Sequence, residues 1–145
     1  MFTTYPDAPW MDIAQLEIGQ KEISGNQHNP RILEYHKSTT LKATQDEVPW
    51  CSAFVTWVLT MAGYKSTASA WARSYLNYGI KLDKPRPGCI VIFSRGSDSG
   101  HVAFFVKSNL LTITVLGGNQ NNQVCYAKYF KYRILGYRWP VKAVL

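Results

Sequence analysis

The first half of the chain carries apolar residues at helical spacing, interrupted by polar segments. This pattern predicts four helices, each with a start or stop signal such as a capping residue, an early proline or a final glycine. We expect them over residues 7–19, 30–37, 49–63 and 69–78. Residues 38–48 are polar and predict a loop.

The second half has a different pattern, in which β-branched and aromatic residues form short apolar runs between turns. Such runs are typical of strands, and the two that flank Ser108 and Asn109 predict a hairpin. Because the helices come first and the strands follow, the pattern favours an α+β fold in which N-terminal helices pack on a C-terminal antiparallel sheet. The expected strands are residues 89–94, 101–107, 111–116, 124–132 and 134–139.

A cysteine lies at the beginning of the third predicted helix. Cys51 is the first member of an apolar stripe that continues through Val55, Val58, Leu59 and Ala62, so it is expected where the helix meets a neighbouring surface. A free thiol has a pKa of about 8.5, which a helix N-terminus and a nearby imidazolium can lower to roughly 3.5–7.5. Backbone N–H groups at the same helix end can hold an oxyanion. Cys51 is therefore a candidate nucleophile, although a buried, inert cysteine would fit the same position.

A histidine and an asparagine follow at the edges of later strands. His101 comes after a glycine at the start of an apolar strand, and Asn119 follows the next strand. The order Cys, His, Asn is that of thiol hydrolases, in which the histidine exchanges a proton with the thiol and the amide orients the imidazole. We therefore expect Cys51, His101 and Asn119 to cleave an amide bond. His28, in a polar loop, and His36, on the second helix, compete for the role of base.

Simpler explanations exist for the same residues. A histidine at the end of a strand can be merely exposed to water, and residues 117–122 form a natural turn. Adjacent antiparallel strands can nevertheless bring His101 and Asn119 to one sheet face. Gln120, one residue further on, would face the opposite way if the strand continued.

Several residues near Cys51 are candidates for holding the substrate or the oxyanion. A loop amide or carboxyl group just before the cysteine can line the oxyanion site or bind a substrate amine, although such groups are often only solvated. Trp50 and Trp71 are expected to form walls of a groove between the helix and the sheet. The candidates for oxyanion or substrate contacts are Gln45, Asp46, Glu47, Trp50 and Gln120.

Length and composition are those of one globular chain, so we expect residues 1–145 to form a single catalytic domain. The three cysteines give no disulfide framework, and none are spaced as Cys-x-x-Cys, so neither a metal nor an organic cofactor is expected. Cys89 and Cys125 lie inside predicted strands and are expected to pack in the core.

The net charge of the chain is +7. An excess of positive charge favours anionic partners such as nucleic acid, a membrane surface or a cell-wall polymer, and it also serves solubility. A non-catalytic basic module that binds the cell wall or nucleic acid is therefore an alternative to an enzyme. The N-terminus lacks a basic region followed by an apolar stretch, so no signal peptide is expected, and the longest apolar run is too short to cross a bilayer.

Five segments together resemble the CHAP family of cysteine, histidine-dependent amidohydrolases and peptidases, particularly its small phage- and prophage-associated members. The resemblance implies a papain-like fold with Cys51 as nucleophile, His101 as base and Asn119 as the residue that orients the histidine. Many CHAP enzymes carry a glutamate two positions before such an asparagine; this chain has Gly117 there, so a carboxylate third member is absent. The segments are Pro49–Val55, Lys84–Phe93, Gly100–Val102, Val115–Gln120 and Leu135–Pro140.

The resemblance also implies a substrate and a setting. The substrate would be bacterial peptidoglycan, cut either between the lactyl group of the sugar and L-alanine or within the stem peptide. We expect a monomer, made in the cytoplasm, that acts in the periplasm or at the cell wall as a phage lysin or as a secreted effector partnered by a small immunity protein. Neither nucleic acid binding nor stable membrane insertion is expected. An acyltransferase or deamidase that uses the same three residues is a further alternative.

Overall fold

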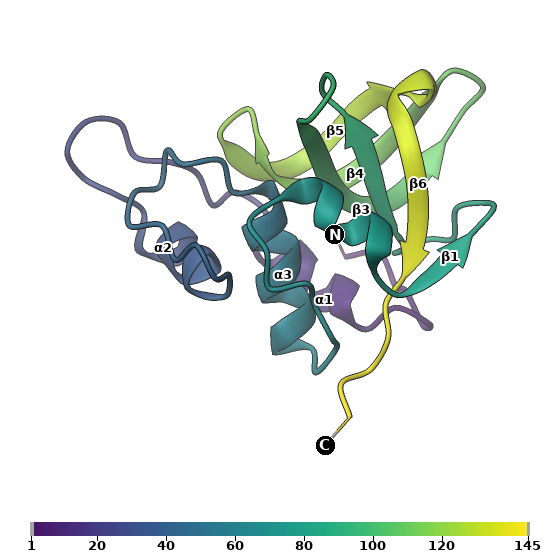
Figure 1. Ribbon diagram of the computed structural model, residues 1–145, viewed down its shortest axis with the longest axis horizontal. Coiled ribbons are helices and arrows are strands. Elements are labelled where there is room, and N and C mark those ends of the chain that lie inside the picture. The colour runs from purple at the N-terminus through teal and green to yellow at the C-terminus, as the bar shows by residue number, and fades with distance from the viewer. Residues whose placement is uncertain (1, 145) are drawn as a thin grey trace.

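The computed structural model describes residues 2–144, which form three α-helices, two short 3₁₀ helices and a six-stranded sheet (Figure 1). All strand pairs are antiparallel, in the order β1-β6-β2-β3-β4-β5, so the predicted α+β fold is confirmed. The helices are α1 (Trp10–Leu16), α2 (Pro30–Lys37), α3 (Cys51–Met61), η1 (Ala72–Asn77) and η2 (Lys131–Arg133). The strands are β1 (Ile80–Leu82), β2 (Ile90–Ser94), β3 (Gly100–Ser108), β4 (Thr112–Gln120), β5 (Gln123–Phe130) and β6 (Ile134–Trp139).

The three α-helices gather on one side of the sheet (Figure 1). Helix α3 lies in the middle, where it contacts α1, α2 and the strands β3 and β4. Its first six residues, Cys51–Thr56, are all buried, so the helix is covered on nearly every side. The N-terminus of α3 is thereby fixed at the junction between helices and sheet.

Local signals place helix α2 where the sequence predicts it. The Asn29 side chain accepts a hydrogen bond of 2.8 Å from the backbone N–H of Arg31, and Pro30 occupies the first helical position, where no N–H is needed. The predicted range 30–37 is confirmed. Helix α3 begins at Cys51, two residues after the predicted start at Pro49.

The sheet is strongly curled. Strands β2 and β5 are separated by β3 and β4, so in a flat sheet they would lie about 14 Å apart. The rings of Phe93 on β2 and Tyr129 on β5 nevertheless have centroids only 4.9 Å apart. His101 on β3 lies between them, with centroid distances of 6.1 Å and 5.3 Å to the two rings. The imidazole is therefore enclosed by aromatic side chains on the concave face of the sheet.

Both faces of the sheet are covered by apolar side chains. One set packs against the helices, and the other fills the concave face near His101. The strand residues of the first set are Ile90, Ile92, Val102, Phe104, Leu116 and Val124. The second set comprises Cys89, Val91, Phe93, Ala103, Phe105, Ile113 and Val115. Cys89 thus packs in the core as predicted, whereas Cys125 is only partly buried.

The predicted fourth helix is wrong in type and extent. Only the 3₁₀ helix η1 forms there, and Trp71 before it is extended. The reason is local, since hydroxyl groups of Thr67 and Ser69 accept hydrogen bonds from backbone N–H groups two residues further on, which competes with helical bonding. The segment is then anchored by Tyr75, whose buried hydroxyl lies 2.6 Å from that of Thr56.

Two features of the sheet differ from the sequence prediction. The short strand β1, for which the sequence pattern gives no prediction, pairs with β6. Strand β4 runs to Gln120, whereas the pattern predicts its end at Leu116. Gly117 still pairs with Cys125 of β5, and after a shift of register Gln120 pairs with Gln123. The last residues of β4 are therefore part of the ladder and lie beside β3, where His101 is found.

Candidate active site

Cys51 is the first residue of α3, and its side chain is almost fully buried. The first N–H groups of a helix have no carbonyl partner within it, and in α3 the first helical bond joins the Phe54 N–H to the Trp50 carbonyl at 2.9 Å. The N–H groups of Cys51 and Ser52 face the thiol, as does the N–H of Val102 on β3. The sulfur therefore lies at the helix N-terminus and against the residue that follows His101.

Burial raises the pKa of the Cys51 thiol above its ordinary value. The N–H of Val102, the positive charge of Arg95 and the N–H groups of the helix act in the opposite direction without reversing the shift. The thiol is consequently protonated at neutral pH in the free protein. A thiolate can form here only if a neighbouring base takes the proton.

His101 is completely buried at the beginning of β3. Its Nε2 atom lies 2.9 Å from Oε1 of Gln120, while its Nδ1 atom is buried and has no hydrogen-bond partner among the described residues. Burial lowers the pKa of His101 to about 4; the bond to Gln120 raises that pKa and the charge of Arg95 lowers it further. The imidazole is therefore neutral at neutral pH.

The neighbours of Gln120 determine which nitrogen of His101 carries the proton. The Gln120 Nε2 group donates a hydrogen bond of 2.6 Å to the carbonyl of Cys125, which can only accept. Its Oε1 atom therefore faces His101 and must accept a hydrogen bond from Nε2–H. In a neutral imidazole this leaves Nδ1 with a free electron pair. The atom without a partner is thus the basic one.

The backbone before Gln120 explains how its side chain reaches His101. Asn119 has a φ of 56°, in the left-handed region, and the register of β4 against β5 shifts between Gly117 and Gln120. Asn121 and Asn122 also have positive φ values, as a two-residue type I′ hairpin turn requires. The irregularity at Asn119 reverses the alternation of side chains, so that Gln120 points to the face that carries His101.

Two glycines make this arrangement sterically possible. A Cβ atom on Gly117 would lie 2.7 Å from Oε1 of Gln120 and 2.8 Å from the Ala103 side chain. A Cβ atom on Gly118 would lie 2.7 Å from side-chain atoms of both Phe54 and Trp50. Gly117 therefore leaves room for the amide of Gln120, and Gly118 allows β4 to pack closely on α3.

The family model of the CHAP domain matches residues 43–119, which is just over half of the chain. This chain belongs to the CHAP domain family. The matched segment contains Cys51, His101 and Asn119 and ends one residue before Gln120. CHAP domains are generally hydrolases, and membership supports an amidase or peptidase activity related to peptidoglycan. No curated protein matches the chain.

In this CHAP domain the amide that contacts His101 belongs to Gln120, so the predicted contact from Asn119 is wrong. The structure gives Gln120 the bond to Nε2, whereas Asn119 occupies the left-handed position that redirects the strand. The prediction also placed Gln120 on the opposite face, because it assumed regular alternation of side chains. A sequence signal was available: the Asn121-Asn122 pair is typical of a two-residue hairpin turn, which makes Gln120 the last residue of its strand.

Two other predicted contacts of the CHAP domain are also corrected. Trp50 is fully buried, with its indole N–H donating to Oε2 of Glu22 at 2.9 Å, so it forms no wall of an open groove. Asp46 is buried as well and organises the loop before α3. Its carboxylate accepts hydrogen bonds from the N–H groups of Ile23 (2.9 Å) and Asn29 (2.8 Å) and lies 3.2 Å from Nδ1 of His28. Burial raises the pKa of Asp46, but these three donors outweigh it and the net shift is downward.

The remaining candidates lie at the surface or away from the thiol. Gln45 and Glu47 are in the loop before α3, where both are exposed. Trp71 is largely exposed, and its indole N–H donates to the Asp98 carbonyl at 3.2 Å. Of the competing histidines, His28 is paired with Asp46, and His36 is fully buried in α2 with no partner for either ring nitrogen among the described residues. The interactions found for these two histidines do not involve Cys51.

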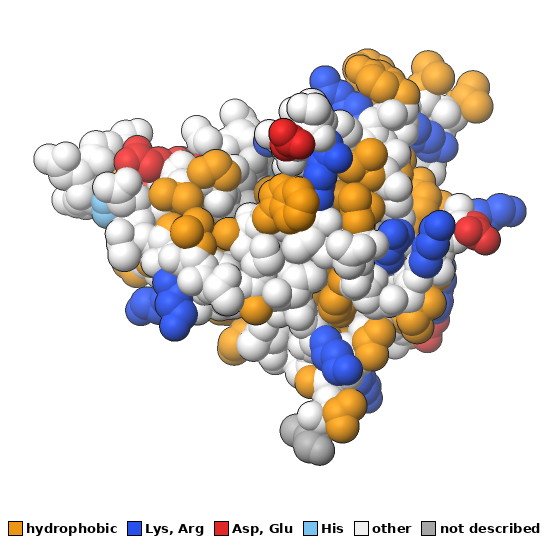
Figure 2. Space-filling model, viewed as in Figure 1, with side chains coloured by type: hydrophobic (Ala, Val, Ile, Leu, Met, Phe, Trp, Pro, Cys, Tyr) orange, Lys and Arg blue, Asp and Glu red, His pale blue; other side chains and the backbone are white. Residues whose placement is uncertain are grey.

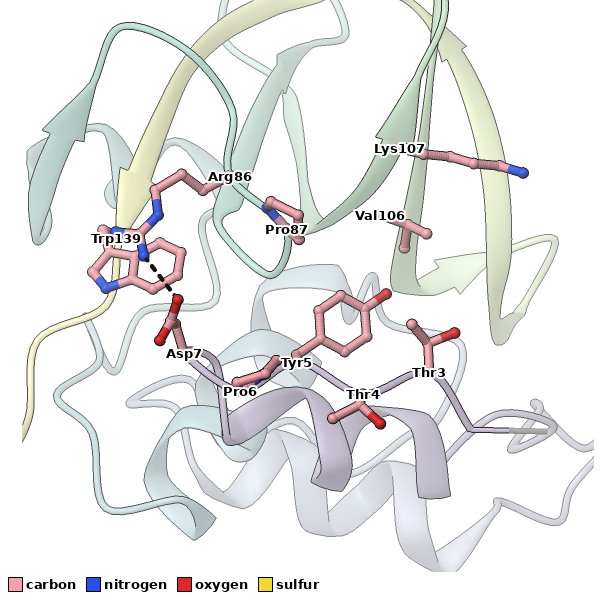
Figure 3. A pocket seen from close by; sticks show the side chains of 10 residues that line it. All are labelled: Thr3, Thr4, Tyr5, Pro6, Asp7, Arg86, Pro87, Val106, Lys107 and Trp139. Atoms are coloured by element: carbon pink, nitrogen blue, oxygen red, sulfur yellow. Dashed lines mark ion pairs between the residues drawn. The ribbon is translucent and has the colours of Figure 1, made fainter.

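A cavity of about 530 Å³ has neither Cys51 nor His101 among its lining residues (Figure 3). It is formed by the N-terminal segment 3–7, by Val106 and Lys107 of β3, and by a cation–π pair in which the Arg86 guanidinium lies 3.8 Å from the Trp139 ring. His101 is at the opposite end of β3, so this cavity is separate from the thiol.

Within residues 2–144, no group of three or more His, Cys, Asp or Glu side chains is placed to hold a metal ion. None of the described helices is long and apolar enough to span a membrane.

Proposed function

We propose that this protein hydrolyses an amide bond of bacterial peptidoglycan, with Cys51 as nucleophile, His101 as base and Gln120 as the residue that orients the imidazole. One observation carries the proposal: the Nδ1 atom of His101 is buried without a hydrogen-bond partner among residues 2–144, and His101 immediately precedes Val102, whose N–H faces the Cys51 sulfur. The bond from Nε2–H to Gln120 leaves this Nδ1 atom without a proton. Membership of the CHAP family supports the class of substrate.

The first half of the reaction forms a thioester. Nδ1 of His101 takes the proton of the Cys51 thiol, and the resulting imidazolium and thiolate stabilise each other, which offsets the cost of charging either group in a buried site. The thiolate attacks the carbonyl carbon, and the oxyanion accepts a hydrogen bond from the backbone N–H of Cys51 at the helix N-terminus. As the C–N bond breaks, Nδ1–H gives its proton to the leaving amine.

The second half releases the acid. Water enters beside His101, Nδ1 takes one of its protons, and the hydroxide oxygen attacks the thioester. The C–S bond then breaks, the proton on Nδ1 returns to the sulfur, and a carboxylic acid leaves. Throughout both halves the Nε2–H stays bound to Gln120 Oε1, which keeps the ring in one orientation and one tautomer. Gln120 carries out this role as an uncharged amide.

The experiment is digestion of purified peptidoglycan followed by mass spectrometry of the released fragments. Stem peptides without the lactyl group identify an amidase, and shortened stems identify an endopeptidase. Cys51→Ala should abolish release. Cys125→Ala should retain most of it, because the Cys125 backbone carbonyl that holds the Gln120 side chain is unchanged and only the 3.3 Å bond from the Cys125 thiol to the Gln120 carbonyl is lost. Full release by the folded Cys51→Ala variant would refute the role of Cys51 as nucleophile. No release by the wild type would refute the hydrolase and leave a basic binding module as the explanation.

The setting that fits this reaction is phage lysis or a secreted antibacterial effector acting at the cell wall. The two settings differ in whether an inhibitor is needed, because the cell that makes an effector needs a cognate inhibitor of it. Expression of the protein in the periplasm of a sensitive bacterium should cause lysis that depends on Cys51. Lysis by the Cys51→Ala variant would rule out wall cleavage as the cause.

A further inference from the structure

A second cavity of about 360 Å³ lies at the end of β2, where Ser94 pairs with Gly100, the residue before His101. Phe93 of β2 pairs with His101 of β3 on one side and with Ile134 of β6 on the other. The residues next to Phe93 and Ile134 in the chain therefore lie at the same end of the sheet as His101. Arg95 follows Phe93 by two residues and Arg133 precedes Ile134. The lining residues are Ser94, Arg95, Gly96, Tyr132 and Arg133.

Both arginines in this cavity have free charges. The Arg95 and Arg133 side chains are exposed, and neither forms an ion pair with a carboxylate of residues 2–144. Asp98, in the same loop as Arg95, also makes no ion pair within that range. On the face seen in Figure 2, most Lys and Arg side chains lie over the sheet half of the molecule. Planar guanidinium groups bind carboxylates through two parallel hydrogen bonds.

The loop that presents Arg95 is held in place by another arginine. The Arg73 guanidinium donates to the carbonyls of Gly96 (2.6 Å) and Ser99 (2.9 Å) and to the Ser94 hydroxyl (3.3 Å). The Arg95 N–H also bonds to the Ser99 carbonyl at 2.9 Å. Arg73 thus uses its donors within the protein and fixes the backbone of the loop, from which the exposed Arg95 side chain extends. A fixed loop lowers the entropic cost of binding a ligand there.

Tyr129 connects this cavity to the reacting groups. Its hydroxyl lies 3.4 Å from Nε2 of His101, and the Arg95 side chain faces the same hydroxyl. A substrate group held by Arg95 would therefore lie one side chain away from the imidazole. The separation between Arg95 and the His101 imidazole suits a substrate group that belongs to the residue next to the scissile amide.

We propose that Arg95 and Arg133 bind a free carboxylate on the substrate residue adjacent to the bond that is cut. This inference rests on the proposed function and narrows it, because it selects peptides with an ionised carboxylate at that position over those whose carboxylate is amidated. Arg95 acts in substrate binding, and Arg133 supplies the second positive charge across the cavity.

The test compares two stem peptides that differ only in a carboxylate or a carboxamide beside the scissile bond. The wild type should cleave the carboxylate peptide with a kcat/KM about 10-fold higher, and Arg95→Gln should remove this preference, mainly through KM. Arg95→Lys should keep part of it, because lysine retains the charge and loses the planar donor pair. The carboxamide peptide is the internal control, since it reports any effect of Arg95 on the thiol itself. Arg86→Gln, on the cavity of Figure 3, is the matched control and should retain the full preference.

Binding to the Cys51→Ala variant gives a second readout that needs no turnover. Calorimetry should show tighter binding of the carboxylate peptide, and the difference should disappear when Arg95→Gln is added. Equal kcat/KM values for the two peptides in the wild type would overturn the inference and leave the proposed function intact. An equal loss on both peptides in Arg95→Gln would also overturn it. If the wild type cleaves neither the peptides nor purified peptidoglycan, the proposed function fails and this inference fails with it.

Discussion

The Nε2 atom of His101 and the Oε1 atom of Gln120 lie 2.9 Å apart, and the other end of the same amide donates to the Cys125 carbonyl at 2.6 Å. Because the carbonyl can only accept, the amide has one orientation, and so the imidazole has one tautomer. A neutral glutamine therefore provides both the orientation and the proton position that a carboxylate provides in other histidine-dependent hydrolases.

Replacing Gln120 should damage catalysis more than replacing its neighbour. We expect Gln120→Leu to lower kcat by about 10- to 100-fold, because the imidazole loses its 2.9 Å bond to the amide and misalignment of the order of 1 Å carries costs of that size. Asn119→Gly should have little effect, since its part is a left-handed backbone conformation that glycine adopts readily. The measurement is kcat on a peptidoglycan peptide. A larger loss for Asn119→Gly than for Gln120→Leu would restore Asn119 as the orienting residue.

Alanine substitutions at the two glycines before Asn119 should have different effects, one on kcat and the other on stability. Gly117→Ala places a methyl group against the Gln120 amide and should lower kcat by about 10-fold or more through the same misalignment. Gly118→Ala drives a methyl group into the buried Phe54 and Trp50 and should lower the free energy of unfolding by about 1–3 kcal/mol. Urea unfolding and steady-state kinetics on both variants separate these effects. Identical stability and kinetic changes in the two variants would contradict this division.

Acid should destabilise the protein through its buried histidines. Burial lowers the pKa of His101 to about 4 and also lowers that of His36, against an ordinary value of 6.5. Below pH 6.5 the unfolded chain binds protons that the folded protein excludes, so the contribution to stability is complete above pH 6.5 and is lost as the pH falls toward 4. For His101 the loss is about 3 kcal/mol at most.

The check is the free energy of unfolding measured between pH 7 and pH 4.5. The slope against pH should be smaller in His101→Gln and in His36→Gln than in the wild type, because each variant lacks one proton-binding site of the unfolded chain. The slope is the readout, since either substitution can also change the stability at pH 7. Equal slopes in all three proteins would show that neither histidine is buried in its neutral form.

Local signals in the sequence were enough to predict one half of the site. An early proline, Pro49, and a buried stripe predict Cys51 at the N-terminus of α3, and a glycine followed by an apolar run predicts His101 at the start of a strand. The α+β arrangement follows from the order of helices and strands. These predictions depend on short stretches of chain, in which neighbouring residues determine the outcome.

The features that were missed depend on contacts between distant segments. Gln120 faces His101 because β4 loses its regular alternation at Asn119, which a pattern of period two does not reveal. Trp50 is buried because its indole N–H finds Glu22, 28 residues earlier in the chain. No motif in the sequence marks Arg95, because the curl of the sheet is what brings its side chain to Tyr129, which lies beside His101.

The most direct test of the account is the rate at which iodoacetamide alkylates each cysteine, followed by peptide mass spectrometry. Cys51 should react faster than Cys125, although Cys125 is the more exposed thiol, because the proposed mechanism makes the His101 imidazole the base for Cys51 and assigns no base to Cys125. His101→Gln should slow the reaction of Cys51 by about 10-fold or more and leave Cys125 unchanged, since general-base assistance has at least that size. An unaltered rate at Cys51 in the folded His101→Gln variant would show that the imidazole does not activate this thiol.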